Sequence, residues 1–316
     1  MPTTTRSSWL ASEFKLLLRG DDRSFDHLLS AFGQPTVLSE SKTTVRTHFL
    51  TKDANGDPVV KKLAKAMAGF VVDFAIPRKR MRAALASANA TGSFREVTAL
   101  GQEAAQLFVR TGGSGEGGEL LLFMLMEKTL GHPQLLSKFS LKTSANVHVH
   151  GSDGVHGHMN DDGVLDLYWG ESKLYQSSSD AIKDCFESVA PFLQPDGDDN
   201  RQQDLLLLRD QLNIEDQHVA AQLIKYFDDS EPESVRVRWN AVCLIGFDLN
   251  DYPDSLTAVH EEIQKIEVRV RRWQKSIRSR LSENGLLEVN IDVFCIPMPS
   301  VDKLRKAVDK RLGLIA

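Results

Sequence analysis

The stretch HVHGSDGVHGHMNDDGVLDLYWGESKLY, residues 148–175, decides the fold of this chain. It contains two strand-like runs on either side of NDDG (160–163), a composition typical of a tight turn. The second run alternates apolar side chains, as a strand with one face in a protein core does. The same two runs carry Asp153, Glu171 and Lys173. We therefore expect a β-hairpin that holds two carboxylates and an amine beside its apolar residues.

Glu171 and Lys173 stand two positions apart, which places both side chains on one face of a strand. A solvated strand edge also produces this pattern, so the Glu-Ser-Lys triplet alone is weak. Asp153 strengthens the pattern because it lies at the end of the preceding strand, and the turn folds that strand back toward Glu171. The sequence thus predicts that the three charged groups converge at one end of the hairpin.

Two carboxylates and a lysine suit the hydrolysis of a phosphodiester bond. Carboxylate oxygens are the ligands that Mg²⁺ or Mn²⁺ prefers, and a bound metal acidifies water and neutralises charge on the phosphate. Lys173 can orient or deprotonate the water, or stabilise the developing oxyanion. Glu119, at the start of an apolar helix, is a candidate for a further carboxylate. Glu119 has an equal alternative explanation, because acidic residues stabilise helix N-termini.

The rest of the chain alternates helical and strand patterns and has no repeat of fixed period. This order predicts an α/β fold in which a mixed central β-sheet is flanked by helices. A β-hairpin is expected where the alternating strand 43–50 is followed by a turn at Asn55–Gly56. The expected helices cover 8–19, 58–74, 91–110, about 119–130, 181–193, a region ending near 227, 255–283, and the end of the chain from about 300; the expected strands cover 43–50, 146–153, 164–175, 235–248 and 286–297.

Composition limits the classes of function. The net charge of −5 means that any contact with nucleic acid needs a local basic patch. Three scattered cysteines favour neither a disulfide framework nor a cysteine-rich metal site, and they fit a reducing compartment. The polar N-terminus lacks the apolar core of a signal peptide, and the longest apolar run, 120–126, is too short to span a bilayer. We expect a soluble, cytoplasmic protein without a membrane partner.

Two basic segments are candidates for binding DNA. The predicted helix at 255–283 aligns several cations opposite its apolar residues, and a shorter basic cluster precedes it in the chain. A solvated helix face paired with acidic residues explains the first pattern equally well. The functional alternative is contact with the phosphates of duplex DNA, independent of sequence. The residues concerned are Arg269, Arg272, Lys275 and Arg280 in the helix, and Arg78, Lys79 and Arg80 in the cluster.

GSDG (151–154), GESKLY (170–175) and, upstream, GEGGELLLF (115–123) resemble the PD-(D/E)xK nuclease superfamily. More narrowly, they resemble the nuclease subunit of Hachiman-type anti-phage defence systems. The resemblance implies a restriction-endonuclease-like core, with Asp153 and Glu171 as metal ligands, Lys173 as the catalytic lysine and Glu119 as a helix-borne ligand. Ser152 stands where the superfamily's name has proline, a departure that weakens the generic assignment only slightly.

The resemblance also implies a role and a partner. The chain would be a Mg²⁺-dependent DNA endonuclease, the effector of a bacterial anti-phage system, restrained by a paired superfamily 2-type helicase. The resemblance to this family extends from about residue 55 to the last predicted strand. We therefore expect residues 1–90 to form an N-terminal α+β region that meets the partner, and residues 91–316 to form the nuclease domain.

Two other functions fit the same residues. Two His-x-His pairs surround Asp153 and could form a zinc hydrolase site, with members His148, His150, His156 and His158. In the nuclease hypothesis, His156 would instead lie near the scissile phosphate, and Ser172 would line the cleft between Glu171 and Lys173. The third possibility is a DNA-binding or assembly module without catalysis, in which the basic helix functions and the carboxylates do not.

Overall fold

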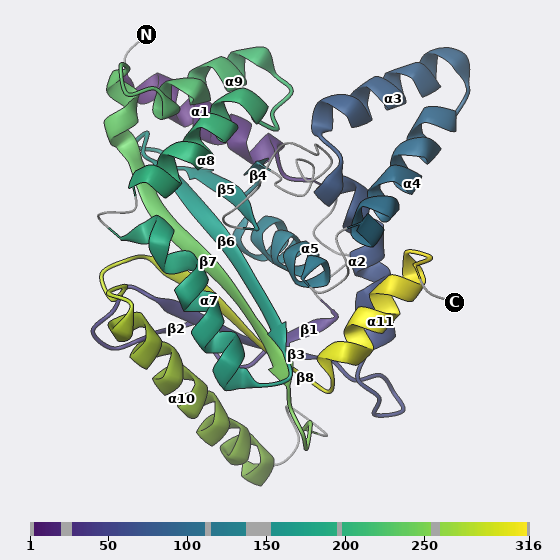
Figure 1. Cartoon of the computed structure of the whole chain (residues 1–316), viewed down its shortest axis with the longest axis vertical. Helices are drawn as coiled ribbons and strands as arrows, with labels where there is room; N and C mark the ends of the chain where they lie inside the picture. Colours follow the sequence, from purple (N-terminus) through teal and green to yellow (C-terminus); the bar gives the residue numbers. More distant parts are fainter. Residues whose placement is uncertain are drawn as a thin grey trace.

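The computed structural model describes residues 3–19, 27–110, 115–136, 153–194, 198–253 and 260–314. Among these residues, eight strands form one sheet in the order β1-β3-β8-β7-β6-β5-β4, and β2 also pairs with β3 (Figure 1). The strands are β1 (Leu29–Ala31), β2 (Thr36–Val37), β3 (Thr44–Leu50), β4 (Gln134–Leu136), β5 (Gly154–Met159), β6 (Leu165–Tyr175), β7 (Val237–Asp248) and β8 (Ile291–Met298).

The sheet is mixed, as predicted. Its centre consists of the four parallel strands β3, β8, β7 and β6, and the antiparallel strands β5, β4, β1 and β2 complete its edges. The central strands β7 and β8 are buried along almost their whole length, because helices cover both of their faces. These findings confirm the predicted α/β class.

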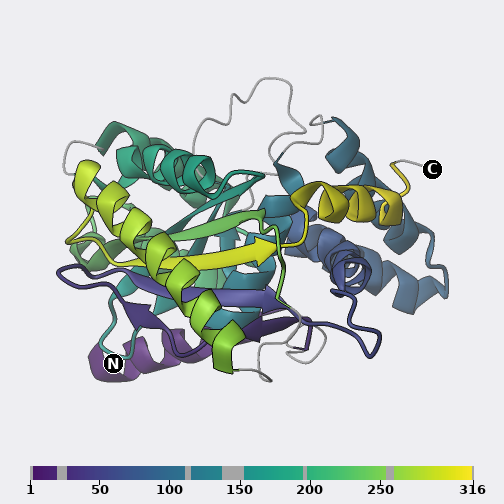
Figure 2. The same cartoon turned by 90° about the horizontal axis from the view of Figure 1, so that it is seen from below.

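One face of the sheet packs against α2 (Val60–Ala75), α4 (Arg95–Arg110), α5 (Glu116–Leu125) and α11 (Val301–Arg311). On that face, Val242 and Leu244 of β7 alternate with Cys243 and Ile245, which join the core on the opposite side. The opposite core contains α1 (Thr3–Leu16), α7 (Ser178–Leu193), α8 (Asp198–Gln211), α9 (Gln217–Ile224) and α10 (His260–Glu283). Figure 2 shows α2, α4 and α11 gathered to one side of the molecule, with α10 crossing in front of the sheet in this view.

Most predicted elements are present with shifted ends. The turn at 160–163 forms, with hydrogen bonds between Asn160 and Val164 and from Gly163 to Asn160. α5 begins at Glu116, slightly earlier than expected, and α7 contains Pro191 instead of ending there. The predicted strand at 146–153 lies outside the described residues except for Asp153, and β5 begins directly after it.

Two local predictions need correction. The Asn55–Gly56 turn exists, but the chain returns only through a single bridge between Lys52 and Pro58 before α2 begins, so no full hairpin forms there. The basic residues after Pro77 start a helix that the sequence did not reveal, α3 (Arg78–Thr91). Only Ala84 and Ala88 of this helix are buried, so its apolar stripe was too weak to detect.

Residues 1–90 contribute to the same sheet and core as the rest of the chain. β3 lies between β1 and β8 and pairs in parallel with β8 over Thr44–Thr47. α2 packs against α11 at the other end of the sequence and shares its core with α5 (Figure 1). The predicted boundary near residue 90 therefore does not coincide with a break in the sheet.

Candidate active site

β6 brings the predicted catalytic residues to the edge of the β5–β6 pair. Gly154 of β5 lies opposite Gly170, and the amide of Asp153 donates to the carbonyl of Gly170 at 2.8 Å. Beyond this point β6 continues to Tyr175 with β7 on its other side. Asp153 is thus the last described residue before β5, and Glu171 follows Gly170 directly on the neighbouring strand.

Glu171 and Lys173 form a close ion pair on one face of β6. The Lys173 Nζ lies 2.6 Å from the Glu171 Oε1, and their side chains are 21% and 7% exposed respectively. The two-residue spacing on a strand gives this arrangement directly, so the sequence-based pairing is confirmed. The pair faces α7, where the Cys185 Sγ lies 3.7 Å from the Glu171 carbonyl oxygen.

Asp153 joins the cluster through the residue between the two charges. Its Oδ2 accepts hydrogen bonds from the backbone amide of Ser172 at 2.7 Å and from the Ser172 hydroxyl at 2.6 Å. Ser172 is buried, and its side chain faces α5. The closeness of α5 shows this orientation, since a Cβ on Gly118 would lie 2.9 Å from the Ser172 Oγ. Ser172 therefore fixes the position of the Asp153 carboxylate beside Glu171.

The cluster has unusual electrostatics. Burial and the neighbouring Asp153 carboxylate raise the pKa of Glu171 to about 7, although Lys173 and a hydrogen bond with Ser188 act in the opposite direction. Burial lowers the pKa of Lys173, but the Glu171 carboxylate outweighs it, helped by Asp153, and the pKa of Lys173 is raised overall. Like-charged carboxylates held near each other, with a lysine that stays protonated, are characteristic of a functional site.

Ser188 is a contact of Glu171 that the sequence did not reveal. It stands in an apolar helical pattern on α7, between the buried residues Cys185 and Val189. A serine in an apolar helical stripe can be noticed in the sequence as a candidate buried polar contact. The sequence does not tell which strand residue that serine contacts. Cys185 itself is fully buried, and burial raises the pKa of its thiol well above the usual value, so it is a core residue and not a nucleophile.

Glu119 lies on the other side of β6. It belongs to the first turn of α5 and is 8% exposed, and the neighbouring Gly118 contacts Ser172, whereas Glu171 faces α7. The Glu119 Oε1 is 3.8 Å from the position that a Cβ on Gly115 would take, so the carboxylate folds back over the start of its own helix. Glu119 thus stands at the N-terminus of α5, as the alternative explanation expects, and its role as a metal ligand stays a prediction.

The described residues offer two carboxylates for a metal ion, not three. No group of three or more His, Cys, Asp or Glu side chains within the described ranges is close enough to hold one. Asp153 and Glu171 nevertheless fit a divalent cation, because burial and the Asp153 carboxylate both raise the pKa of Glu171, and a cation would offset the repulsion between the two carboxylates. Mg²⁺ commonly binds to proteins through one or two carboxylates and completes its shell with water and phosphate oxygens.

The histidines do not gather around Asp153 in the described part of the chain. His148 and His150 lie outside it. His156 is 3% exposed, and its Nδ1 lies 2.8 Å from the carbonyl oxygen of His132. Its burial against Phe123 of α5 gives no support to a position at a scissile phosphate.

Two of the four residues of the predicted basic face on α10 are paired with acidic residues. Arg269 lies 3.5 Å from Asp251, and Arg280 lies 2.5 Å from Glu283. Arg272 and Lys275 are exposed, and no ion pair with a described residue is formed by either. Of the four helix residues predicted to bind DNA, these two are the ones available for a phosphate.

The shorter basic cluster does not form one surface. The Arg78 side chain is only 12% exposed and donates to the backbone carbonyls of Gln134 and Asn213. Arg80 forms a two-fold ion pair with Glu103, and Lys79 is exposed. Arg78 is therefore corrected from a DNA contact to a structural residue, because its donors are directed into the protein.

The fold and the cluster define a mixed α/β protein in which a buried carboxylate, Glu171, lies with the half-buried Asp153 and the ammonium of Lys173 beside the β5–β6 pair. The HamA family model matches residues 26–312, and the chain belongs to the HamA family. This membership supports the Hachiman assignment and indicates a role in anti-phage defence. A search of curated proteins returned no match. No helix within the described residues is long and apolar enough to cross a membrane.

Proposed function

We propose that this chain is a metal-dependent DNA endonuclease and the effector of a Hachiman anti-phage system. The observation that carries the proposal is the cluster of Asp153, Glu171 and Lys173, in which the lysine ammonium lies 2.6 Å from Glu171. The HamA family match over residues 26–312 supports the same assignment at the level of the defence system. The resemblance of GSDG and GESKLY to PD-(D/E)xK nucleases supplies the reaction class.

In this proposal, Asp153 and Glu171 hold a Mg²⁺ or Mn²⁺ ion. When bound, the ion supplies a more acidic water and positive charge for the phosphate. The two carboxylates are preorganised for the ion. Ser172 fixes Asp153 through two hydrogen bonds, and Ser188 of α7 forms a hydrogen bond with Glu171. Glu119 then serves α5 and is not required as a ligand.

Lys173 acts as a donor and a positive charge. Its raised pKa keeps the ammonium protonated at neutral pH, so Lys173 is unsuited to remove a proton from water. A fixed ammonium can instead orient the attacking water and stabilise the charge that grows on the phosphate oxygens. Of the roles considered from the sequence, the electrostatic one is favoured.

Arg272 and Lys275 on α10 are the candidate contacts for the phosphates of duplex DNA, with an affinity that falls as salt rises. A superfamily 2-type helicase is proposed as the partner that restrains the nuclease. That partnership rests on the Hachiman resemblance and on the need to control a nuclease inside the cell.

The test is cleavage of plasmid and linear duplex DNA in Mg²⁺ or Mn²⁺, with the full chain alone and with its helicase. Glu171→Gln and Lys173→Met are expected to lower the rate by about a hundredfold or more, because the first removes a metal ligand and the second removes a positive charge beside the phosphate. The matched control is the exposed ion pair on α7, Lys183→Met and Glu187→Gln, which should retain wild-type cleavage.

The other outcomes are equally informative. Equal cleavage by wild type and Glu171→Gln would place the active site elsewhere. DNA binding without cleavage, with and without the helicase, would favour an assembly module. Activity that requires Zn²⁺ and is lost in His158→Ala would favour the zinc hydrolase.

A further inference from the structure

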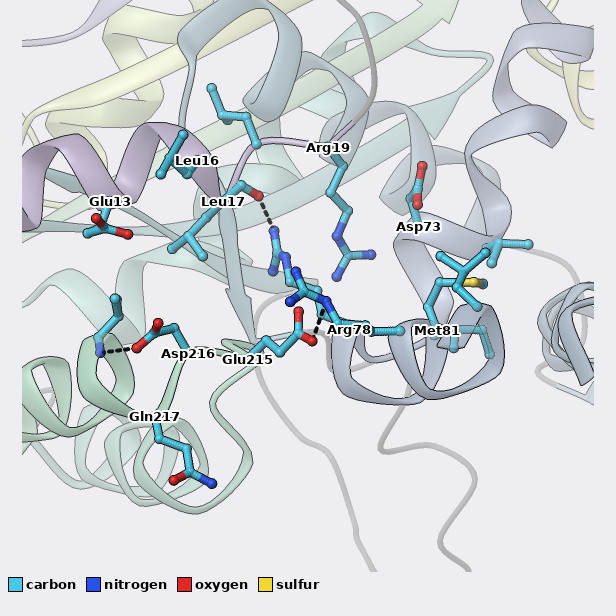
Figure 3. A pocket seen from close by; sticks show the side chains of 16 residues that line it. Glu13, Leu16, Leu17, Arg19, Asp73, Arg78, Met81, Glu215, Asp216 and Gln217 are labelled. Atoms are coloured by element: carbon cyan, nitrogen blue, oxygen red, sulfur yellow. Dashed lines mark hydrogen bonds and ion pairs between the residues drawn. The ribbon is translucent and has the colours of Figure 1, made fainter. Parts of the chain in front are cut away.

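A pocket lies between α1, the junction of α2 and α3, and the start of α9 (Figure 3). Its volume is about 740 Å³, within the range of sites for small molecules. Its described lining residues do not include Asp153, Glu171 or Lys173. Any ligand of this pocket would therefore be additional to the proposed nuclease reaction.

Hydrogen bonds of the Arg19 backbone fix this residue at the pocket. The Arg19 amide donates to the Glu127 Oε2 at 2.8 Å, and the Arg19 carbonyl accepts from the Lys128 ammonium. Glu127 and Lys128 both belong to η1 (Met126–Leu130), a π-helical turn that continues α5. Because both backbone groups are held, the guanidinium has a defined place in the pocket, as Figure 3 shows.

The guanidinium of Arg19 has unused donors. Its Nε and Nη2 atoms are buried and form no hydrogen bond among the residues described. Burial lowers the pKa of Arg19, while Glu127 and Asp73 oppose that effect, so the group stays charged. A buried charged donor without an acceptor is costly, and an acceptor from a ligand would remove that cost.

Arg78, another arginine of the pocket, already forms hydrogen bonds and an ion pair within the protein. It donates to the carbonyl of Leu17, to that of Gln134 at 3.0 Å and to that of Asn213 at 2.7 Å. Its charge is matched by Glu127, whose Oε1 lies 3.6 Å away. Arg78 thus shapes the pocket and adds positive potential, and Arg19 is the residue left to bind.

The other acidic side chains limit how much negative charge the pocket accepts. Asp73 lies beside Arg19, Glu215 pairs with Arg82, and Asp216 caps α9 by accepting from the amides of His218 and Val219 (Figure 3). Glu13 is a fourth carboxylate of the described lining, against the three arginines Arg19, Arg78 and Arg82, so a polyphosphate or a nucleic-acid backbone would be repelled. A single negative charge on the ligand fits the unused donors of Arg19.

The walls of the pocket are aliphatic. They include Leu16, Leu17, Val72, Ile76, Met81 and Leu85. No aromatic side chain is present among the described lining residues, so a nucleobase would find no ring to stack on. The surface complements an aliphatic group with an acidic end.

We propose that this pocket binds a carboxylate carried on an aliphatic body, with Arg19 as the residue that receives the carboxylate. The fork of guanidinium donors suits the two oxygens of a carboxylate, and the aliphatic walls suit the body. The carboxylate can belong to a free organic acid or to the C-terminus of an apolar peptide. The chemistry is the same in both cases, and the experiment separates them.

The test follows the Nε–H signal of Arg19 by NMR of the full chain labelled with ¹⁵N. The probes are hexanoate, its neutral analogue hexanamide, acetate, inorganic phosphate, and an acetylated leucyl-leucine with a free C-terminus. Hexanoate or the peptide should shift the Arg19 signal and raise the unfolding temperature. Hexanamide, acetate and phosphate should bind at least about tenfold more weakly, because each lacks the charge or the body.

Variants test whether Arg19 is the residue that binds the carboxylate. Arg19→Met should abolish the effect of hexanoate, and Arg19→Lys, which keeps the charge without the fork, should weaken it by about tenfold. Arg80→Met on α3, outside the lining, is the matched control and should bind as wild type. Stronger binding of the peptide would identify a protein terminus as the source, and stronger binding of hexanoate a free acid. The proposal is wrong if phosphate binds as well as hexanoate, or if Arg19→Met binds unchanged.

Discussion

At the scale of single residues, the candidate site depends on keeping charges where a strand would otherwise be apolar. Glu171 is 5% exposed and follows Leu165, Leu167 and Trp169 on the same face of β6. Burial of a carboxylate beside another carboxylate is unfavourable, and the raised pKa of Glu171 reports that cost. Lys173 and Ser172 reduce the cost by pairing with one carboxylate each.

Ser172→Ala tests how Asp153 is held. The variant removes the 2.6 Å hydrogen bond from the hydroxyl and leaves the one from the amide. We expect the free energy of unfolding to fall by about 1 kcal/mol and cleavage to weaken without disappearing. Urea unfolding measures the first and the DNA assay the second. Ser179→Ala, at an exposed position, is the control, and an equal loss in both variants would contradict the role given to Ser172.

The buried histidines predict how stability depends on pH. Burial lowers the pKa of His156 to about 3 and that of His132 to about 4, whereas an unfolded histidine titrates near about 6.5. Below that pH the unfolded chain binds protons that the native chain does not, so stability is complete above about pH 6.5 and falls on acidification. Each histidine contributes a slope of up to about 1.4 kcal/mol per pH unit.

Urea unfolding of wild type and His156→Gln between neutral and mildly acidic pH measures this slope. The variant should be less stable at neutral pH because packing is lost, but its stability should decline less steeply on acidification. A decline of equal steepness in both proteins would show that His156 is not held neutral in the native state.

At the scale of secondary-structure elements, the site depends on the approach of α5 to β6. A Cβ on Gly118 would lie 2.9 Å from the Ser172 Oγ and 3.2 Å from the Leu174 Cγ, so only glycine lets the helix come this close. The neighbouring Gly117 has nothing within 4 Å of such a Cβ. α5 thus offers two adjacent glycines, of which one is constrained by packing.

Gly118→Ala and Gly117→Ala form a matched pair on α5. Gly118→Ala should lower the free energy of unfolding by about 1–3 kcal/mol through overpacking and should reduce cleavage by displacing Ser172. Gly117→Ala should raise stability by up to about 1 kcal/mol, because alanine favours a helix more than glycine does. Chemical unfolding compares the two, and equal effects of the same sign would contradict the packing of α5 on β6.

The same elements show what the sequence can and cannot reveal. The pairing of Glu171 with Lys173 followed from strand periodicity, and the facing of Asp153 and Glu171 followed from the turn at 160–163. The side of β6 on which Glu119 lies was not predictable, because it depends on how α5 packs over Gly118. Arg78 was misassigned to a surface for a similar reason, since its carbonyl acceptors at Gln134 and Asn213 are remote in sequence.

At the scale of the whole molecule, the two ends of the chain are joined through the sheet. β3 pairs in parallel with β8, and α2 packs against α11. Periodicity predicted the α/β class, but the strand order could not be deduced, because each of these contacts links residues more than two hundred positions apart. The N-terminal part is therefore integral to the core that supports β6 and β7.

Deletion of residues 1–90 should prevent folding. The fragment would leave β8 with only β7 as a parallel neighbour and would expose the surfaces of α5 and α11 that α2 covers. We expect the full chain to unfold in one cooperative transition and the fragment to show none, as measured by circular dichroism during urea unfolding. A fragment with a cooperative transition of its own would support an independent domain starting near residue 91.

The measurement that tests the central claim most directly is the binding of Mn²⁺ to the purified chain, followed by the loss of the EPR signal of free Mn²⁺. It requires neither DNA nor a partner, so restraint by a helicase does not affect it. Saturable binding should occur in wild type and in the Lys183→Met/Glu187→Gln control, and should be lost in Glu171→Gln and in Asp153→Asn. Binding that is unchanged in both of these variants would contradict a metal centre at Asp153 and Glu171.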